Sequence, residues 1–134
     1  MLTTDSSGFL RRSLLSNATF SLITGVCFTV ASSPISSLIG LEMPVILVGI
    51  GVSLLVFAAG LILNARREIV NQTEAWIAVL LDTIWVVGSA VVIVAGVLST
   101  TGNWIVVFVA EIVLTFAFLQ FLGLRKMKRV VTAR

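Results

Sequence analysis

The 134-residue chain contains no histidine, no tyrosine and a single cysteine, Cys27. Without histidine it lacks the most common general base, the most common transition-metal ligand and the usual haem ligand. One cysteine cannot form an intrachain disulfide, and Cys27 lies within an apolar run, so we expect a small buried side chain. These absences weigh against an enzyme, a metalloprotein and a disulfide-stabilised scaffold.

Charged residues are also scarce. They make up 11% of the chain, less than half of the ~25% of a soluble domain. Hydrophobic residues make up 58%, and the mean hydropathy is +1.15. These values exclude a soluble globular domain, a disordered chain and, in spite of a pI of about 10.0, a nucleic-acid-binding protein. The sequence predicts an integral membrane protein with one domain, residues 1–134, and no cofactor.

A membrane-spanning helix needs about 20 mostly apolar residues. Four segments meet this length, so we predict an all-α bundle of four transmembrane helices at about 13–33, 44–63, 75–98 and 103–123. The connections are short. They are residues 34–43 between Pro34 and Pro44 with a short interfacial helix at 35–41, the polar residues 64–74, and a tight turn at 99–102.

The basic residues indicate the orientation of the chain. With four spans, all nine fall in the two tails and the middle connection, on one side of the bilayer: Arg11, Arg12, Arg66, Arg67, Arg125, Lys126, Lys128, Arg129 and Arg134. The positive-inside rule makes that side cytoplasmic. We therefore predict a multi-pass protein of the inner (cytoplasmic) membrane with both termini in the cytoplasm. The basic residues act as topology determinants or contact anionic lipid headgroups. Trp76 and Trp104 stand near the starts of the third and fourth helices, where they fit the aromatic belts.

Two alternative interpretations concern the first helix and the two halves of the chain. Arg11-Arg12 before an apolar run that ends in Ala31-Ser32-Ser33 is similar to a cleavable signal, although the run is longer than a usual signal core. We favour retention of this helix in the mature bundle. The halves 12–67 and 76–129 each hold two helices and end in basic residues, which leaves open a parallel duplication.

Small and polar residues share one face on each helix. Such residues favour helix–helix contacts in membranes, so we expect these faces to point into the bundle. In chain order, the face of the first helix holds Asn17, Ser21, Gly25 and Ser32, and that of the second holds Gly49, Ser53, Gly60 and Asn64. The face of the third helix holds Ala75, Ala78, Asp82, Ser89, Gly96 and Thr100, and that of the fourth holds Glu111 and Thr115.

Two carboxyl groups lie inside the predicted spans. Each is a candidate functional site, because a carboxylate there costs about 2.5–3.5 kcal/mol on insertion scales. Asp82 lies at a depth similar to that of Asn17 and Gln120, and we expect these three to form one hydrogen-bonded layer. Glu111 lies nearer the outer side, and Gln120 lies roughly opposite it on the same helix. Trp85, one turn after Asp82, packs in the bundle, lines a small pocket or donates its indole N–H to the carboxyl group.

Five short motifs extend along the chain: Leu10-Arg11-Arg12 with Asn17, Ile39-Gly40-Leu41, Phe57-Ala58-Ala59-Gly60, Leu81-Asp82-x-x-Trp85 with Ser89, and Phe116-Ala117-Phe118-Leu119-Gln120 before Leu124-Arg125. Together with the four-span layout they resemble a loosely defined group of small bacterial four-helix membrane proteins of unassigned function. The resemblance covers most of the chain and implies no activity.

A second comparison is rejected. Val109-Ala110-Glu111-Ile112 is similar to the Ala-Glu-Val around the essential glutamate of the small multidrug-resistance transporters, which are also short four-helix proteins. That glutamate lies in the first helix of the family, whereas Glu111 lies in the fourth, so its role is not carried over. We expect a non-enzymatic structural or accessory subunit, alone, as a homo-oligomer or in a larger membrane complex. The alternative is a small transporter or channel that uses Asp82 and Glu111 as proton or cation sites.

Overall fold

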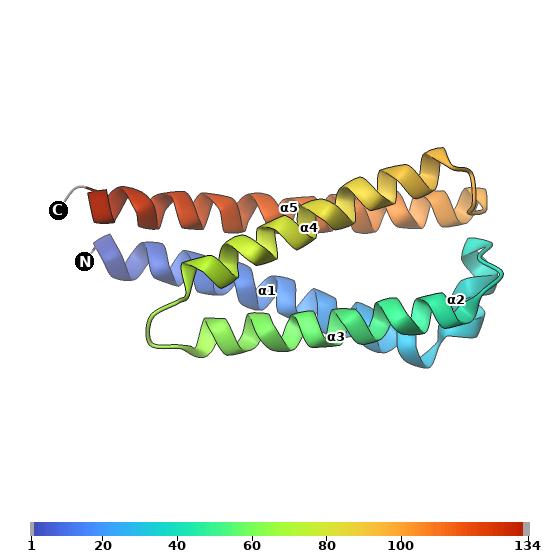
Figure 1. Ribbon diagram of the computed structural model, residues 1–134, viewed down its shortest axis with the longest axis horizontal. Coiled ribbons are helices and arrows are strands. Elements are labelled where there is room, and N and C mark those ends of the chain that lie inside the picture. The colour runs from blue at the N-terminus through green and yellow to red at the C-terminus, as the bar shows by residue number, and fades with distance from the viewer. Residues whose placement is uncertain (1, 133–134) are drawn as a thin grey trace.

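The computed structural model describes residues 2–132, which form five helices and no strands (Figure 1). The helices are α1 (Leu2–Val30), α2 (Ser32–Ile39), α3 (Pro44–Arg66), α4 (Gln72–Val94) and α5 (Thr100–Thr132). Four of them are long and apolar enough to span a membrane, namely α1, α3, α4 and α5. The predicted all-α architecture with four candidate spans is therefore confirmed.

The helix ends follow from local chemistry. Pro44 opens α3, where its missing N–H costs no hydrogen bond. Asn71 precedes α4, and its side chain accepts a hydrogen bond from the backbone N–H of Glu74 at 3.2 Å. The short helix α2 ends at Gly40, whose φ of 77° favours glycine. The predicted short helix near residues 35–41 is thus present, but it starts three residues earlier, at Ser32, and ends two residues earlier, at Ile39.

Two predicted boundaries were wrong. The first span ends at Val30, and Ser32 and Ser33 belong to α2. The turn predicted at 99–102 lies at 95–99 instead, because α4 stops at Val94 and α5 already starts at Thr100. Gly96, with φ at 68°, reverses the chain in this turn. Hydropathy alone did not show this break, since the residues around Gly96 are as apolar as the helix before them.

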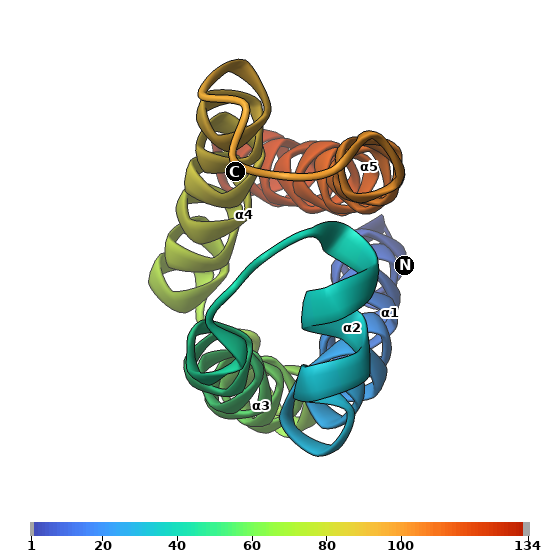
Figure 2. The same ribbon diagram turned by 90° about the vertical axis from the view of Figure 1, so that its right-hand side faces the viewer.

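The four long helices are arranged in the cyclic order α1, α3, α4, α5 (Figure 2). Helix α1 packs against both α3 and α5, and α4 packs against α5, whereas α3 and α4 touch little. The first turns of α1, the last turns of α5 and the α3–α4 loop lie at one end of the bundle (Figure 1). This end carries all the basic residues within 2–132, which lie in these segments or, for Arg66, at the last residue of α3. Arg134 lies outside the described residues.

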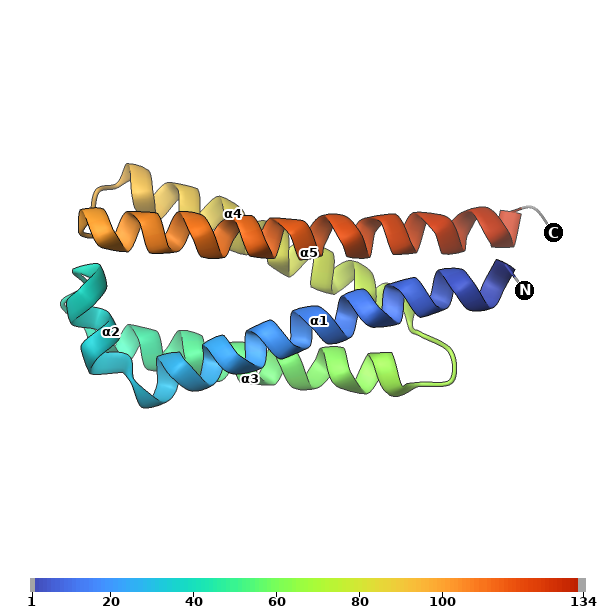
Figure 3. The ribbon, with the colours of Figure 1, turned by 180° about the vertical axis from the view of Figure 1, so that it is seen from behind.

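The helices α1 and α5 contact each other most closely near the chain termini and diverge toward the other end (Figure 3). Near the termini, Gly123 of α5 lies against Leu10 of α1. At the opposite end α2 fills the space between them, and its Ile39 lies against Gly102 of α5. The tightly packed core sits in the half near the termini. It consists of Leu10, Leu14, Ala18, Ala58, Leu61, Ala65, Val70, Ala75, Ala78 and Leu124.

A pair of glycines allows α1 and α3 to approach closely. A Cβ added to Gly51 would lie 2.8 Å from the backbone oxygen of Gly25, and one added to Gly25 would lie 2.9 Å from that of Gly51. Both contacts are shorter than real Cβ atoms tolerate, so the crossing requires glycine on both helices. Gly49, one half-turn earlier on α3, has open space around it.

We predict that Gly51→Ala destabilises the protein by about 1–3 kcal/mol, because the added methyl group must push α1 and α3 apart. Gly49→Ala on the same helix is the matched control and should be neutral or stabilising by up to about 1 kcal/mol, the helix propensity gain of alanine. Unfolding in detergent micelles, followed by circular dichroism, measures both. Equal effects of the two substitutions would contradict the close helix crossing.

Candidate functional site

A polar cluster lies in the interior, where α1, α4 and α5 meet. One carboxylate oxygen of Asp82, Oδ2, accepts a hydrogen bond from the side-chain amide of Asn17 at 2.7 Å and from that of Gln120 at 3.2 Å. Ser21 donates to the amide oxygen of Asn17 at 3.3 Å. All four side chains are buried, and Gln120 has no exposed surface. We call these four residues the Asp82 cluster.

Helical periodicity places each member. On α4, Ala75, Ala78, Asp82 and Ser89 recur at intervals of three, four and seven residues and are all buried. Asn17 and Gln120 each lie five residues, about 8 Å, deeper than Arg12 and Arg125. The predicted hydrogen-bonded layer of Asn17, Asp82 and Gln120 is therefore present. The fourth member, Ser21, lies one turn after Asn17 on the same face, and that spacing is the signal that identifies it.

The Asp82 cluster joins three helices through side chains alone. No basic residue lies at its depth, because the described basic residues are confined to the helix ends and the α3–α4 loop. Two amide donors on one carboxyl oxygen replace the water that this oxygen would bind outside the membrane. The amide oxygen of Gln120 has no partner among residues 2–132. The arrangement is suited to holding α1, α4 and α5 in one register.

Trp85 does not donate to the carboxyl group. Its indole nitrogen is buried but makes no hydrogen bond within residues 2–132. The residue is half-buried, one turn from Asp82 on α4. The expected hydrogen bond to Asp82 is therefore absent, and the position of Trp85 agrees with the expected packing role.

Glu111 does not point into the bundle, contrary to the expectation for its polar face. Its side chain is exposed on α5, as is that of Thr115. Helix α5 carries polar residues on two nearly opposite faces, and the face with Gln120 is the one that meets α1 and α4. The face with Glu111 is consequently turned outward. The Glu111 carboxyl group makes no hydrogen bond or ion pair in the described part of the chain.

Other predicted inward positions are also exposed. On α3 these are Gly49, Ser53 and Gly60, and on α1 the residue is Cys27. The small face of α3 points outward because α3 buries its opposite side, which carries Gly51 and Ala58, against α1. Gly96 and Thr100 are exposed because they belong to the α4–α5 turn and the start of α5.

Several basic residues have partners within the chain. The guanidinium of Arg11 donates to the backbone oxygens of Ala65, at 2.7 Å, and Glu68. It therefore satisfies carbonyl groups at the C-terminal end of α3. Arg67 forms an ion pair with Glu74 at 3.0 Å across the α3–α4 loop.

The remaining basic residues form a looser set around the same end. Lys126 lies 4.5 Å from the ring centre of Phe9, and Arg125 lies 5.6 Å from that of Phe121. All of these basic side chains are exposed: Arg125, Lys126, Arg12, Arg66, Lys128 and Arg129. Their exposure at one end is compatible with the predicted role in topology or headgroup contact.

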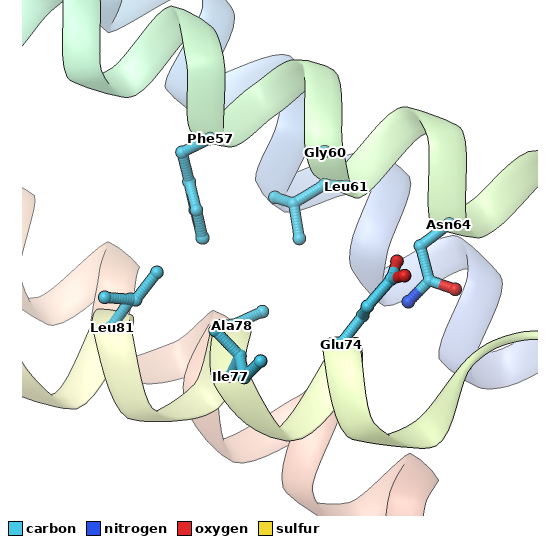
Figure 4. Close-up of a pocket in the computed structure, with 8 residues that line it drawn as sticks. All are labelled: Phe57, Gly60, Leu61, Asn64, Glu74, Ile77, Ala78 and Leu81. Atoms are coloured by element: carbon cyan, nitrogen blue, oxygen red, sulfur yellow. The ribbon is translucent and has the colours of Figure 1, made fainter.

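An apolar groove of about 230 Å³ lies between α3 and α4 (Figure 4). Phe57, Gly60 and Leu61 form one wall, and the other wall consists of Ile77, Ala78 and Leu81. Asn64 and Glu74 close the groove at the loop end. Both are already engaged, Asn64 with the backbone of Asn71 and Glu74 with Arg67. The lining residues therefore present an apolar surface and no group poised for proton transfer or nucleophilic attack.

No group of three His, Cys, Asp or Glu side chains within residues 2–132 is placed to hold a metal ion. Comparison with protein-family models gives no match, and neither does comparison with curated proteins or with solved structures. The resemblance to small bacterial four-helix membrane proteins therefore stays a prediction. The fold and the buried polar cluster define the class of the protein as an all-α multi-pass membrane protein.

We predict that Asp82→Ala destabilises the fold, because it leaves two buried amide groups without an acceptor. An unsatisfied buried donor costs about 1–3 kcal/mol. The exposed neighbour Thr83 provides the control, and Thr83→Ala should change stability by less than about 0.5 kcal/mol. Denaturation in micelles measures both variants, and a double-mutant cycle with Asn17→Ala measures the coupling. Additive effects of Asn17→Ala and Asp82→Ala would exclude a stabilising cluster.

Proposed function

We propose that the protein is a non-enzymatic subunit of a membrane assembly, and that it binds another membrane-embedded helix through the outer face of α5. The observation that carries the proposal is the exposure of Glu111, without a partner, near the middle of a membrane-spanning helix. In this proposal the Asp82 cluster stabilises the fold of one chain, whereas the outer face of α5 binds the partner helix.

The depth of Glu111 follows from the residues that bracket it. Trp104 marks one end of the apolar stretch of α5 and Arg125 the other, so the midpoint falls at Leu114 and Thr115. Glu111 lies about 5 Å from this midpoint. A carboxylate at this depth costs about 2.5–3.5 kcal/mol on insertion scales. Such residues normally face a bundle interior or an aqueous cavity, and a neighbouring helix supplies that interior here.

The surroundings of Glu111 fit a helix–helix contact. Trp104 and Phe108 are 71% and 68% exposed, and Phe118 is 59% exposed on the same face. The hydroxyl of Thr115 already donates to the backbone oxygen of Glu111 at 2.9 Å. The Thr115 hydroxyl therefore donates no hydrogen bond to the carboxyl group, which has no partner within residues 2–132.

The geometry favours assembly over the alternative of a proton or cation pathway. Gln120, which binds Asp82, lies nine residues from Glu111, about 14 Å along α5 and on nearly the opposite face. Asp82 is enclosed by its amide partners, and Glu111 faces outward. A relay between the two carboxyl groups would have to pass through the packed body of α5.

The proposal includes location and orientation. The basic end of the bundle lies in the cytoplasm of the cell and carries both termini and the α3–α4 loop, as the positive-inside rule requires. The membrane is the inner (cytoplasmic) membrane. On the other side, the α4–α5 turn and α2 face outward.

We expect the purified protein in lipid nanodiscs to have a mass above that of the 14.3 kDa chain. Glu111→Leu should shift the mass distribution toward that of the monomer, because leucine at this depth needs no hydrogen-bonding partner. Light scattering or native mass spectrometry measures the change. Val56→Leu is the control, since Val56 is exposed on α3, away from the proposed face.

Reconstituted vesicles test the alternative. Neither Asp82→Asn nor Glu111→Gln should alter pH-dependent proton or cation flux, because neither residue is part of a pathway. If the wild-type protein conducts and these variants do not, the assembly role is overturned in favour of transport. A wild-type monomer without any partner also overturns it.

Reporter fusions test the orientation. A reporter active only outside the cytoplasm should be inactive when it is fused after Arg129 or within the α3–α4 loop, and active when it is placed between Gly96 and Ser99. A cytoplasm-specific reporter should give the reverse pattern. Activity of the first reporter after Arg129 would show that the C-terminus lies outside, contrary to the positive-inside rule.

A further inference from the structure

The outer face of α5 has the spacing of a two-helix seam. Trp104, Phe108, Glu111, Thr115 and Phe118 follow one another at intervals of four, three, four and three residues, and all are exposed. This alternation of three and four is the heptad spacing of left-handed helix pairs, which is also the common packing mode of transmembrane helices. The seam runs for two heptads and places its one ionisable residue, Glu111, at its centre.

We propose that the helix packed against this seam is α5 of a second copy, parallel to the first, with the two Glu111 carboxyl groups hydrogen-bonded to each other. The inference rests on the proposed role of this face in assembly and names the partner. In a parallel pair related by a twofold axis along the membrane normal, each seam residue meets its own counterpart.

The chemistry of the chain allows a second copy to satisfy Glu111 without a cation. All nine basic residues lie in the two tails and the middle connection of the sequence, so this chain holds no cation that could meet Glu111. Two neutral carboxyl groups are self-complementary, since each donates its O–H to the carbonyl oxygen of the other. The pair thus satisfies both groups without a charge in the hydrocarbon.

The register favours a parallel pair. Glu111 lies about 5 Å from the midpoint of the apolar part of α5, so an antiparallel pair would separate the two carboxyl groups by about 10 Å. A parallel pair brings them to the same depth. It also keeps the basic ends of both copies on one side of the membrane, as the charge distribution requires. The aromatic side chains above and below Glu111 then pack across the seam.

Cysteine crosslinking in native membranes tests the pairing. In a Cys27→Ser background, Thr115→Cys and Phe118→Cys each place a thiol on the seam. Val56→Cys on α3 and Val87→Cys on α4 place exposed thiols at similar depth elsewhere. We expect oxidation to give a species of twice the chain mass for the two seam positions and not for the two controls.

Substitution of Glu111 tests the carboxyl pair in a second assay, by energy transfer. Glu111→Leu should weaken the dimer by about 3- to 30-fold in its dissociation constant, the range of interhelical hydrogen bonds in membranes. Glu111→Gln should retain it, because two amide side chains also hydrogen-bond to each other. Dilution of a donor- and acceptor-labelled protein in vesicles, followed by energy transfer, gives the constants.

The outcomes separate this inference from the proposed function. Seam thiols that crosslink to a different protein, with no doubled chain mass, overturn the second copy and leave the subunit role in place. A protein that stays monomeric, with no adduct at the seam, overturns both. Equal crosslinking at seam and control positions indicates random collision and overturns the pairing.

Discussion

A carboxyl group within a bilayer needs a hydrogen-bonding partner, because lipid chains offer none, and this constraint organises the structure. Asp82 meets it inside the chain, where Asn17 and Gln120 both donate to one oxygen. The three residues come from α1, α4 and α5, so their hydrogen bonds fix the rotation and depth of three helices at once. The apolar core then packs between this layer and the end of the bundle near the chain termini.

The rest of the bundle follows from the same layer and from the α1–α3 crossing. Gly25 and Gly51 bring α1 and α3 together, and Arg11 ties α1 to the end of α3. Helix α4 is held at the loop by Asn64 and Glu74 and then leans toward α5. The apolar groove between α3 and α4 results from this divergence.

The spans and the Asp82 cluster were predictable from the sequence, because hydropathy gives length and depth and the helical period gives direction. The orientation of Glu111 was not. Helix α5 has polar groups on two opposite faces, and angular position alone does not tell which face the neighbouring helices cover. The orientation of α3 was mispredicted for the same reason. Gly49 shares its face with other small residues and Gly51 does not, yet the neighbouring helix covers the face with Gly51. Gly96 breaks the chain within an apolar run, where hydropathy shows no change.

The two carboxyl groups therefore act at different levels of structure. Asp82 has its hydrogen-bond donors within the chain, so these hydrogen bonds stabilise the fold of a single copy. Glu111 has no hydrogen-bonding partner within residues 2–132, and the hydroxyl of its neighbour Thr115 donates to the backbone instead. In the proposed assembly, a second helix supplies the partner that the Glu111 carboxyl group lacks. Gln120, the α5 partner of Asp82, lies about 14 Å along α5 from Glu111 and on nearly the opposite face, so substitutions at one carboxyl group should leave the other unaffected. On the proposed role of Glu111, single substitutions at Asp82 and at Glu111 therefore separate folding from assembly.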